Sequence, residues 1–128
     1  MTDLTPDELA LLQSVFDLVR SGDVVAVAGL LDSGVPANLT NSQGDTLLIL
    51  AAYHRHHAVV RALLDRGADT ERVNDRGQTA LAAAVFRQDR PIVEALLAAG
   101  ADPGAGERSA LAIADFFDLP EMRALLQV

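Results

Sequence analysis

Two segments of the chain carry apolar residues at the i, i+3, i+4 spacing that is typical of one buried face of a helix. The apolar residues are Val59, Val60, Leu63 and Leu64 in the first segment and Ile92, Val93, Leu96 and Leu97 in the second. These patterns predict helices that begin near Ala58 and Pro91 and end at a glycine. A short apolar run precedes each of them and predicts a further helix, ending at about Tyr53 or Phe86, whose small residues let a neighbouring helix approach closely.

The same residue types recur at a fixed period along the chain. Gly34, Gly67 and Gly100 are each 33 residues apart, and the leucine pairs Leu30-Leu31, Leu63-Leu64 and Leu96-Leu97 that precede them keep this spacing. A glycine just past a helix supplies the left-handed backbone that closes it. A period of this length indicates a stack of repeated units, each running through a turn, a helix, a short loop, a helix and a glycine.

Polar residues mark the turns and the helix starts. The segments Asn41-Ser42-Gln43-Gly44 and Asn74-Asp75-Arg76-Gly77 place Asn first and Gly last in a four-residue turn, where Asn bonds its own backbone and Gly tolerates the exit geometry. The residues predicted to cap the helices that follow are Thr46, Thr79 and Ser109, with Asp89 capping a second helix.

These units resemble ankyrin repeats. The Thr-Pro-Leu-His-x-Ala pattern of that family corresponds to Thr46-Leu47-Leu48-Ile49-Leu50-Ala51 and Thr79-Ala80-Leu81-Ala82-Ala83-Ala84, and its Gly-Ala-Asp ending to Gly67-Ala68-Asp69 and Gly100-Ala101-Asp102. The Pro and the His of the pattern are absent from both segments. The resemblance implies an all-α solenoid of stacked helix-turn-helix units with short turn or hairpin fingers, which binds a protein partner on its concave face and turn tips.

The whole chain is predicted to form one such domain over residues 1–128. Two full repeats, 41–73 and 74–106, lie between an N-terminal capping repeat, 5–40, and a shortened C-terminal one, 107–128. The first helix opens at Thr5-Pro6-Asp7-Glu8, which reads as a capping box, and is expected to be polar outside. Terminal repeats must present a wettable outer face, which accounts for their atypical sequences.

Composition and charge narrow the classes of function. The chain has 128 residues, 18 acidic against 10 basic, a net charge of −8 and no cysteine. Disulfide and thiolate chemistry are therefore excluded, and the acidic field opposes binding to nucleic acid or to an anionic membrane. No apolar run approaches the ~18 residues of a membrane span, and the start of the chain lacks signal-peptide features, so we expect a cytoplasmic protein.

The candidate for chemistry is the segment His54-Arg55-His56-His57, which holds all three histidines. A metal-binding or enzyme-like role centred on His54, His56 and His57 is one alternative function. The spacing completes no metal-ligand set, however, and His56 falls where ankyrin repeats place a structural histidine. We expect His54 and His57 to be solvated. The acidic residues are expected on turns, helix starts and outer faces, where they are solvated or favourably placed against the helix dipole. We expect the chain to be neither an enzyme nor a cofactor-binding protein.

The period also aligns surface residues into columns. One column contains Arg20, Tyr53, Phe86 and Phe116, and the column beside it contains Ser21, His54, Arg87 and Phe117. Aromatic and Arg residues among polar groups are favoured at protein interfaces. The predicted partner-binding residues are Arg20, Tyr53, His54, Phe86, Arg87 and Phe116, with Ser42, Gln43, Asp45, Asp75, Arg76 and Gln78 from the turns.

Other interpretations of these columns stay open. The aromatic residues could pack across repeats as the edge of the core, and Phe117, beside a cap, is expected to be core or terminal packing. The column could also meet its own copy in a structural homo-oligomer. We expect a monomer that binds a protein partner whose identity the residues do not give.

Overall fold

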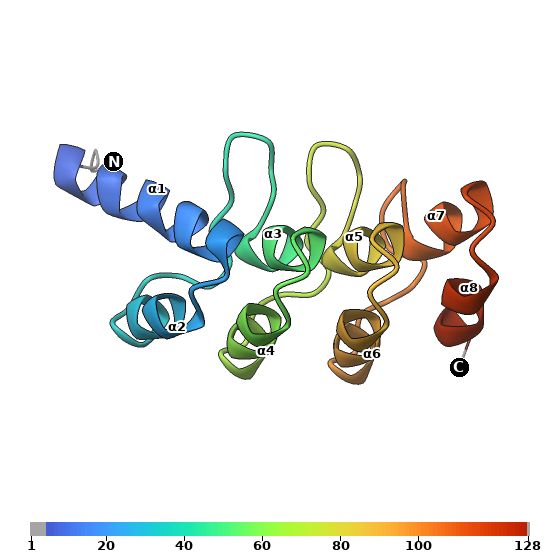
Figure 1. The fold of residues 1–128 in the computed structure, drawn as a ribbon. Coiled ribbons are helices and arrows are strands. Elements are labelled where there is room, and N and C mark those ends of the chain that lie inside the picture. Colours follow the sequence, from blue (N-terminus) through green and yellow to red (C-terminus); the bar gives the residue numbers. More distant parts are fainter. Residues whose placement is uncertain (1–4, 128) are drawn as a thin grey trace.

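The computed structural model describes residues 5–127 and forms eight helices in four successive pairs (Figure 1). The helices are α1 (Pro6–Ser21), α2 (Val24–Asp32), α3 (Leu47–Tyr53), α4 (His57–Asp65), α5 (Ala80–Phe86), α6 (Arg90–Ala98), α7 (Ala110–Phe116) and α8 (Pro120–Leu126). The described residues contain no strand beyond an isolated antiparallel bridge between Thr40 and Thr46. The start of the chain, where signal-peptide features were sought, lies outside the described residues.

The pairs stack side by side in two layers. Helices α1, α3, α5 and α7 form one layer, called the inner layer below, and α2, α4, α6 and α8 form the outer layer (Figure 1). Each helix packs against its counterpart in the next pair and against its own partner. The all-α stack expected from the sequence is confirmed, while the boundaries assigned to the four units remain a prediction.

The core is continuous from one pair to the next. Leu63 and Leu96, one from each predicted apolar stripe, have no exposed surface, and the inner layer contributes small residues such as Ala51 and Ala84 that are fully buried. Helices of 7 to 9 residues are too short to be stable alone in water. Burial between the pairs therefore holds them in helical form.

The predicted caps close the helix starts of the inner layer. The side-chain oxygens of Thr46, Thr79 and Ser109 each accept a hydrogen bond of 3.1 Å from the backbone N–H three residues later. Thr5 accepts a similar bond of 3.1 Å from Glu8. Helices α4 and α6 begin at His57 and Arg90, one residue earlier than predicted.

The segments between pairs form three fingers, defined as residues 41–45, 74–78 and 103–108. Asn41 closes the first with its side-chain oxygen, which accepts bonds of 2.9 Å from the Gln43 N–H and 3.0 Å from the Asp45 N–H. The second repeats this closure around Asn74, whose side-chain amide also donates to Asp45 at 2.8 Å. Asn and Asp side chains therefore link the first two fingers in a sequence that lacks the His of the family pattern.

Backbone contacts also join neighbouring fingers. The Asp75 N–H donates to the Gln43 carbonyl at 3.0 Å, and the Arg108 N–H donates to the Gly77 carbonyl at 3.0 Å. At Gly106, where φ is +87°, a side-chain Cβ would lie 2.4 Å from that same Gly77 carbonyl oxygen. The third finger can therefore lie against the second only because residue 106 is glycine.

The first pair departs from one expectation. Its first helix was expected to be polar outside, yet Leu9 and Leu11 of α1 are 48% and 45% exposed. Val25 of α2 is 81% exposed as well. Helix α1 has no preceding pair to cover this surface among the described residues. No helix of the described part of the chain is long and apolar enough to cross a membrane.

The loop inside each helix pair contains a residue in left-handed conformation. Gly22 occupies this place in the first pair with φ of 80°, and Arg55, Gln88 and Asp118 occupy it in the others with φ of 61°, 54° and 52°. A left-handed backbone costs a non-glycine residue roughly 1–2 kcal/mol. Three of the four loops therefore carry strain that glycine would relieve.

We predict that Gln88→Gly stabilises the protein by about 0.5–1 kcal/mol, because relief of this strain outweighs the greater freedom of glycine in the unfolded chain. Urea unfolding measures the change. Gln88→Ala is the matched control, since it keeps the Cβ and should change stability little. A glycine variant no more stable than the alanine variant would contradict the argument.

Candidate functional site

A groove runs between the fingers and the inner layer. Its volume is about 960 Å³, and residues of α3, α5 and α7 together with all three fingers line it. Ten of the twelve predicted partner-binding residues are among the lining side chains, namely Arg20, Gln43, Asp45, Tyr53, His54, Asp75, Arg76, Gln78, Phe86 and Phe116. Ser42 and Arg87 are not. Whether any of these residues binds a partner stays a prediction.

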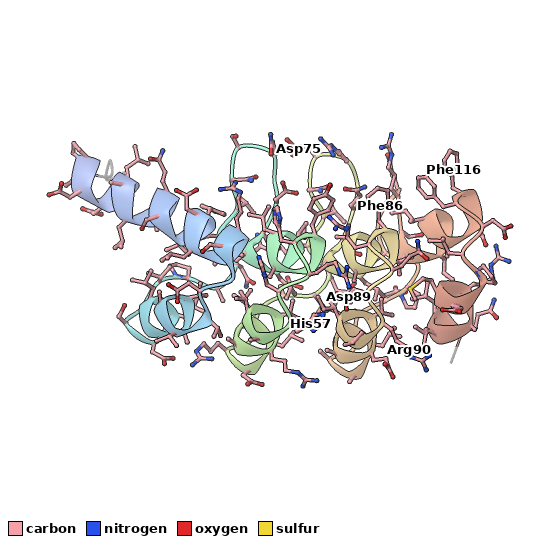
Figure 2. The ribbon with its side chains drawn as sticks, in the orientation of Figure 1. His57, Asp75, Phe86, Asp89, Arg90 and Phe116 are labelled. Carbon is pink, nitrogen blue, oxygen red and sulfur yellow. The ribbon has the colours of Figure 1, made fainter. Side chains whose placement is uncertain are left out.

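Aromatic rings form a row along the groove. The Tyr53 and Phe86 rings, at the ends of α3 and α5, are stacked with centroids 6.3 Å apart and planes within 9°. Although they contact each other across the pair boundary, these residues remain 42% and 43% exposed, and Phe116 is 82% exposed. Figure 2 shows Phe86 and Phe116 on the finger side of the molecule. Core packing therefore leaves much of each ring open to water.

Phe117 also belongs to this row, and of the two roles expected for it, core or terminal packing, the structure contradicts the core. The residue is 50% exposed, and its ring lies edge-on to Phe86 at 5.6 Å and to Phe116 at 4.9 Å. Met122 and Leu126 from α8 are buried at this end of the core, which leaves Phe117 at the surface. Its place in the column beside Phe116 was a signal that could have found it.

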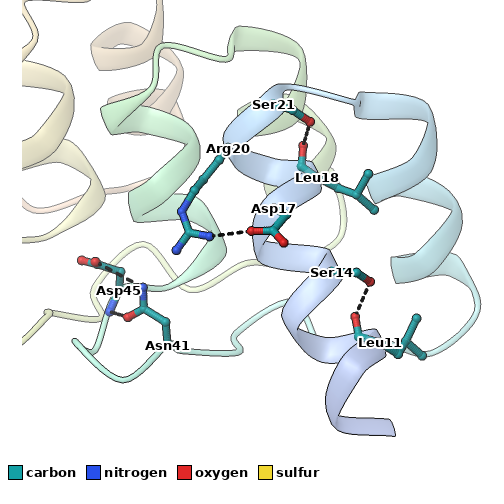
Figure 3. A network of polar contacts seen from close by, with 8 residues as sticks. All are labelled: Leu11, Ser14, Asp17, Leu18, Arg20, Ser21, Asn41 and Asp45. Atoms are coloured by element: carbon teal, nitrogen blue, oxygen red, sulfur yellow. Dashed lines mark hydrogen bonds and ion pairs between the residues drawn. The ribbon is translucent and has the colours of Figure 1, made fainter. Parts of the chain in front are cut away.

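Cationic groups border the row. The Arg87 guanidinium carbon lies 5.2 Å from the Tyr53 ring centroid, within the range of a cation–π interaction. Arg20 lines the groove from the end of α1 and pairs with Asp17 at 3.1 Å (Figure 3). His54 lies between these arginines, and partial burial together with the charges of His56, Arg20 and Arg87 holds its pKa below the ordinary value.

The fingers supply further polar groups to the groove. Asn74, which was assigned only to a turn, lines it, and so does Arg108 from the third finger. Arg108 was not among the predicted binding residues, because the third turn is shortened and lacks the Asn-x-x-Gly pattern of the first two. The carboxylate of Asp45 accepts hydrogen bonds from the side-chain amides of Asn74 at 2.8 Å and Asn41 at 3.5 Å. Asp75 instead lies near the tip of its finger (Figure 2).

Comparison with known proteins agrees with this architecture. Residues 15–106 match the family profile described as ankyrin repeats (3 copies). The chain belongs to the ankyrin repeat family. A curated ankyrin repeat protein of Pseudomonas aeruginosa is 42% identical over 66 residues, a match covering 48% of this chain and 39% of the relative. The chain therefore spans less than half the length of the curated relative that it matches, and repeats of this family are generally protein–protein interaction modules.

The histidines of this ankyrin stack have separate partners. His56 Nε2 lies 2.6 Å from the Arg20 carbonyl, and His57 Nε2 lies 2.8 Å from Asp89 Oδ2. His57 is exposed as expected, with 48% of its side chain accessible, but its ring also bonds to Asp89, which was not expected. Within residues 5–127, no three side chains of the metal-ligating types gather around one point. The geometry therefore does not favour a metal centre formed by His54, His56 and His57.

Asp89 caps α6 as predicted, but it also takes part in contacts with the neighbouring pair that were not predicted. Its side chain is fully buried at the start of α6, where it accepts bonds from His57, from Arg55 Nε at 3.1 Å and from the Ile92 N–H at 3.3 Å. Figure 2 shows His57 and Asp89 together between α4 and α6. Burial alone would raise the pKa of Asp89, but the bonds from His57, Arg55 and Ile92 together hold it below its ordinary value.

We predict that Asp89→Asn destabilises the protein by about 1–3 kcal/mol at neutral pH, because it removes the charged acceptor of these bonds. Since the folded pKa is lowered, the stabilisation is complete above the ordinary value of 3.8 and is lost as pH falls through the folded pKa. Urea unfolding at a series of pH values measures both effects. Asp75→Asn, on an exposed finger, is the control, and a wild-type advantage that persists undiminished in strong acid would contradict the role of the charge.

Proposed function

We propose that this chain is a binding module that holds an extended segment of a protein partner in the groove. The observation that supports it most is the row of exposed rings, Tyr53, Phe86, Phe116 and Phe117, which line one continuous groove. Rings buried in a pocket among polar neighbours are the usual anchors of protein interfaces. A partner that covers this row would remove these exposed rings from water.

The rigidity of the groove favours the same function. Asn41 and Asn74 close their fingers with side-chain hydrogen bonds, and the backbone bonds of Asp75 and Arg108 fasten each finger to its neighbour. A surface ordered during folding loses little further entropy on binding. This module would therefore bind without a catalytic step, in keeping with its family.

The test is capture of partners from native lysate on the immobilised chain. We predict that a Tyr53→Ala, Phe86→Ala double variant loses partners that the wild type retains, since it removes two anchors. Leu9→Ala, Leu11→Ala is the matched control, because it truncates two apolar residues that are 48% and 45% exposed outside the groove. Circular dichroism checks that both variants fold.

Two results would count against the proposal. If the folded double variant recovers the same partners as the wild type, the groove is not the binding surface. If light scattering of the purified chain alone gives a homo-oligomer that the double variant abolishes, the aromatic row meets its own copy instead.

A further inference from the structure

We infer that the segment held in the groove is acidic, with carboxylates that meet Arg76, Arg87 and Arg108 and apolar side chains that cover the aromatic row. This inference rests on the function proposed above and names the chemistry of the partner. A feature of the arginines carries it.

Arginines without an ion pair gather at the groove. Six of the ten arginines lie within 4.0 Å of a carboxylate, namely Arg20, Arg55, Arg66, Arg72, Arg90 and Arg123. The other four have no such partner among the described residues. Of these, Arg76 and Arg108 line the groove and Arg87 lies over the Tyr53 ring, while Arg61 is on the outer layer. In a chain of net charge −8, this leaves unpaired positive charge on one surface.

The carboxylates of the groove form no ion pair with these arginines. Both oxygens of Asp45 bond Asn side chains, from Asn74 at 2.8 Å and from Asn41 at 3.5 Å. Asp75 lies on the same finger as Arg76 but forms no ion pair with it within 4.0 Å. The guanidinium groups of Arg76, Arg87 and Arg108 are therefore available to a carboxylate of a bound partner.

The arrangement of the arginines fits a peptide. Arg76 and Arg108 belong to adjacent fingers that the Arg108 N–H to Gly77 carbonyl bond of 3.0 Å holds together, and Arg87 lies next to the rings of the inner layer. A guanidinium binds a carboxylate through two parallel hydrogen bonds. A segment with acidic residues toward the fingers and apolar residues toward α3 and α5 would satisfy both sides of the groove.

A single-stranded nucleic acid would also use arginines and aromatic rings. It carries a negative charge at every phosphate, however, and its backbone would pass Asp45 and Asp75 in a protein of net charge −8. A peptide needs only a few carboxylates, placed opposite the arginines. The charges therefore favour the acidic peptide.

The test selects displayed random peptides on the full chain and measures the affinity of the enriched, fluorescently labelled peptides. We expect these peptides to be rich in Asp and Glu, to bind more weakly as salt is added, and to lose about five- to tenfold in affinity for Arg76→Gln, Arg108→Gln. Arg61→Gln, which removes an equally unpaired arginine outside the groove, should leave the affinity unchanged.

The outcomes separate this inference from the proposed function. Enriched peptides that are neutral or basic, but bind the Phe86→Ala variant more weakly, would overturn the inference of an acidic segment. They would still support the groove as the binding surface. Peptides whose binding responds to neither the arginine nor the Phe86 change would count against both. Labelled oligothymidylate that binds in an arginine-dependent manner would identify nucleic acid instead. A selection that enriches nothing overturns the acidic peptide, and partner capture then decides the proposed function alone.

Discussion

The structure depends on burial between successive helix pairs, because no pair can shield its own apolar surface. Helices α3, α5 and α7 have 7 residues each, and their small, fully buried residues pack directly against the next helix of the inner layer. Such short helices gain little from their own hydrogen bonds in water. The energy that keeps them helical comes from contact with their neighbours, so stability and stacking are one property of this chain.

The same repetition creates the candidate site. Residues at equal places in successive pairs fall in a row, so that the ends of α3 and α5 bring Tyr53 and Phe86 together at 6.3 Å. The fingers recur at the same interval and wall the groove on its other side. The helices and the short fingers therefore supply all sides of the groove, without long loops. Its surface residues can differ between repeats while the buried apolar residues of each helix stay the same.

The polar links between pairs combine two kinds of contact. Some repeat along the stack, as when Asn38 accepts from the Asp69 N–H at 2.8 Å and Glu71 accepts from the Asp102 N–H at 3.0 Å. Others belong to one boundary, such as the Arg55 and His57 contacts to Asp89. The contacts that repeat along the stack hold successive helix pairs at the same spacing. The contacts found at only one boundary make that boundary between two pairs different from the others.

Interactions between residues close in sequence could be predicted, whereas those between residues far apart in sequence could not. Caps such as Thr46 and apolar stripes such as the one through Leu63 act within one helix, so the helix pairs and their stacking could be predicted. The Asp89 network joins residues 32 and 34 positions apart, outside the repeated pattern, and it was missed. Arg108 was missed because the shortened third turn lacks the Asn-x-x-Gly pattern of the first two. Phe117 was placed in the correct column but was assigned to packing because it lies beside a cap.

The central claim is that folding alone produces a finished groove, and amide hydrogen exchange on the free chain tests it most directly. The Asp75 and Arg108 amides, which fasten each finger to its neighbour, are the groups to follow. If the groove is preformed, both amides exchange slowly, with protection near that of the capped amides of Ile49 and Ala82 inside the stack. Exchange of both at the rate of an unstructured peptide would mean that the fingers open freely, and it would contradict a preformed groove.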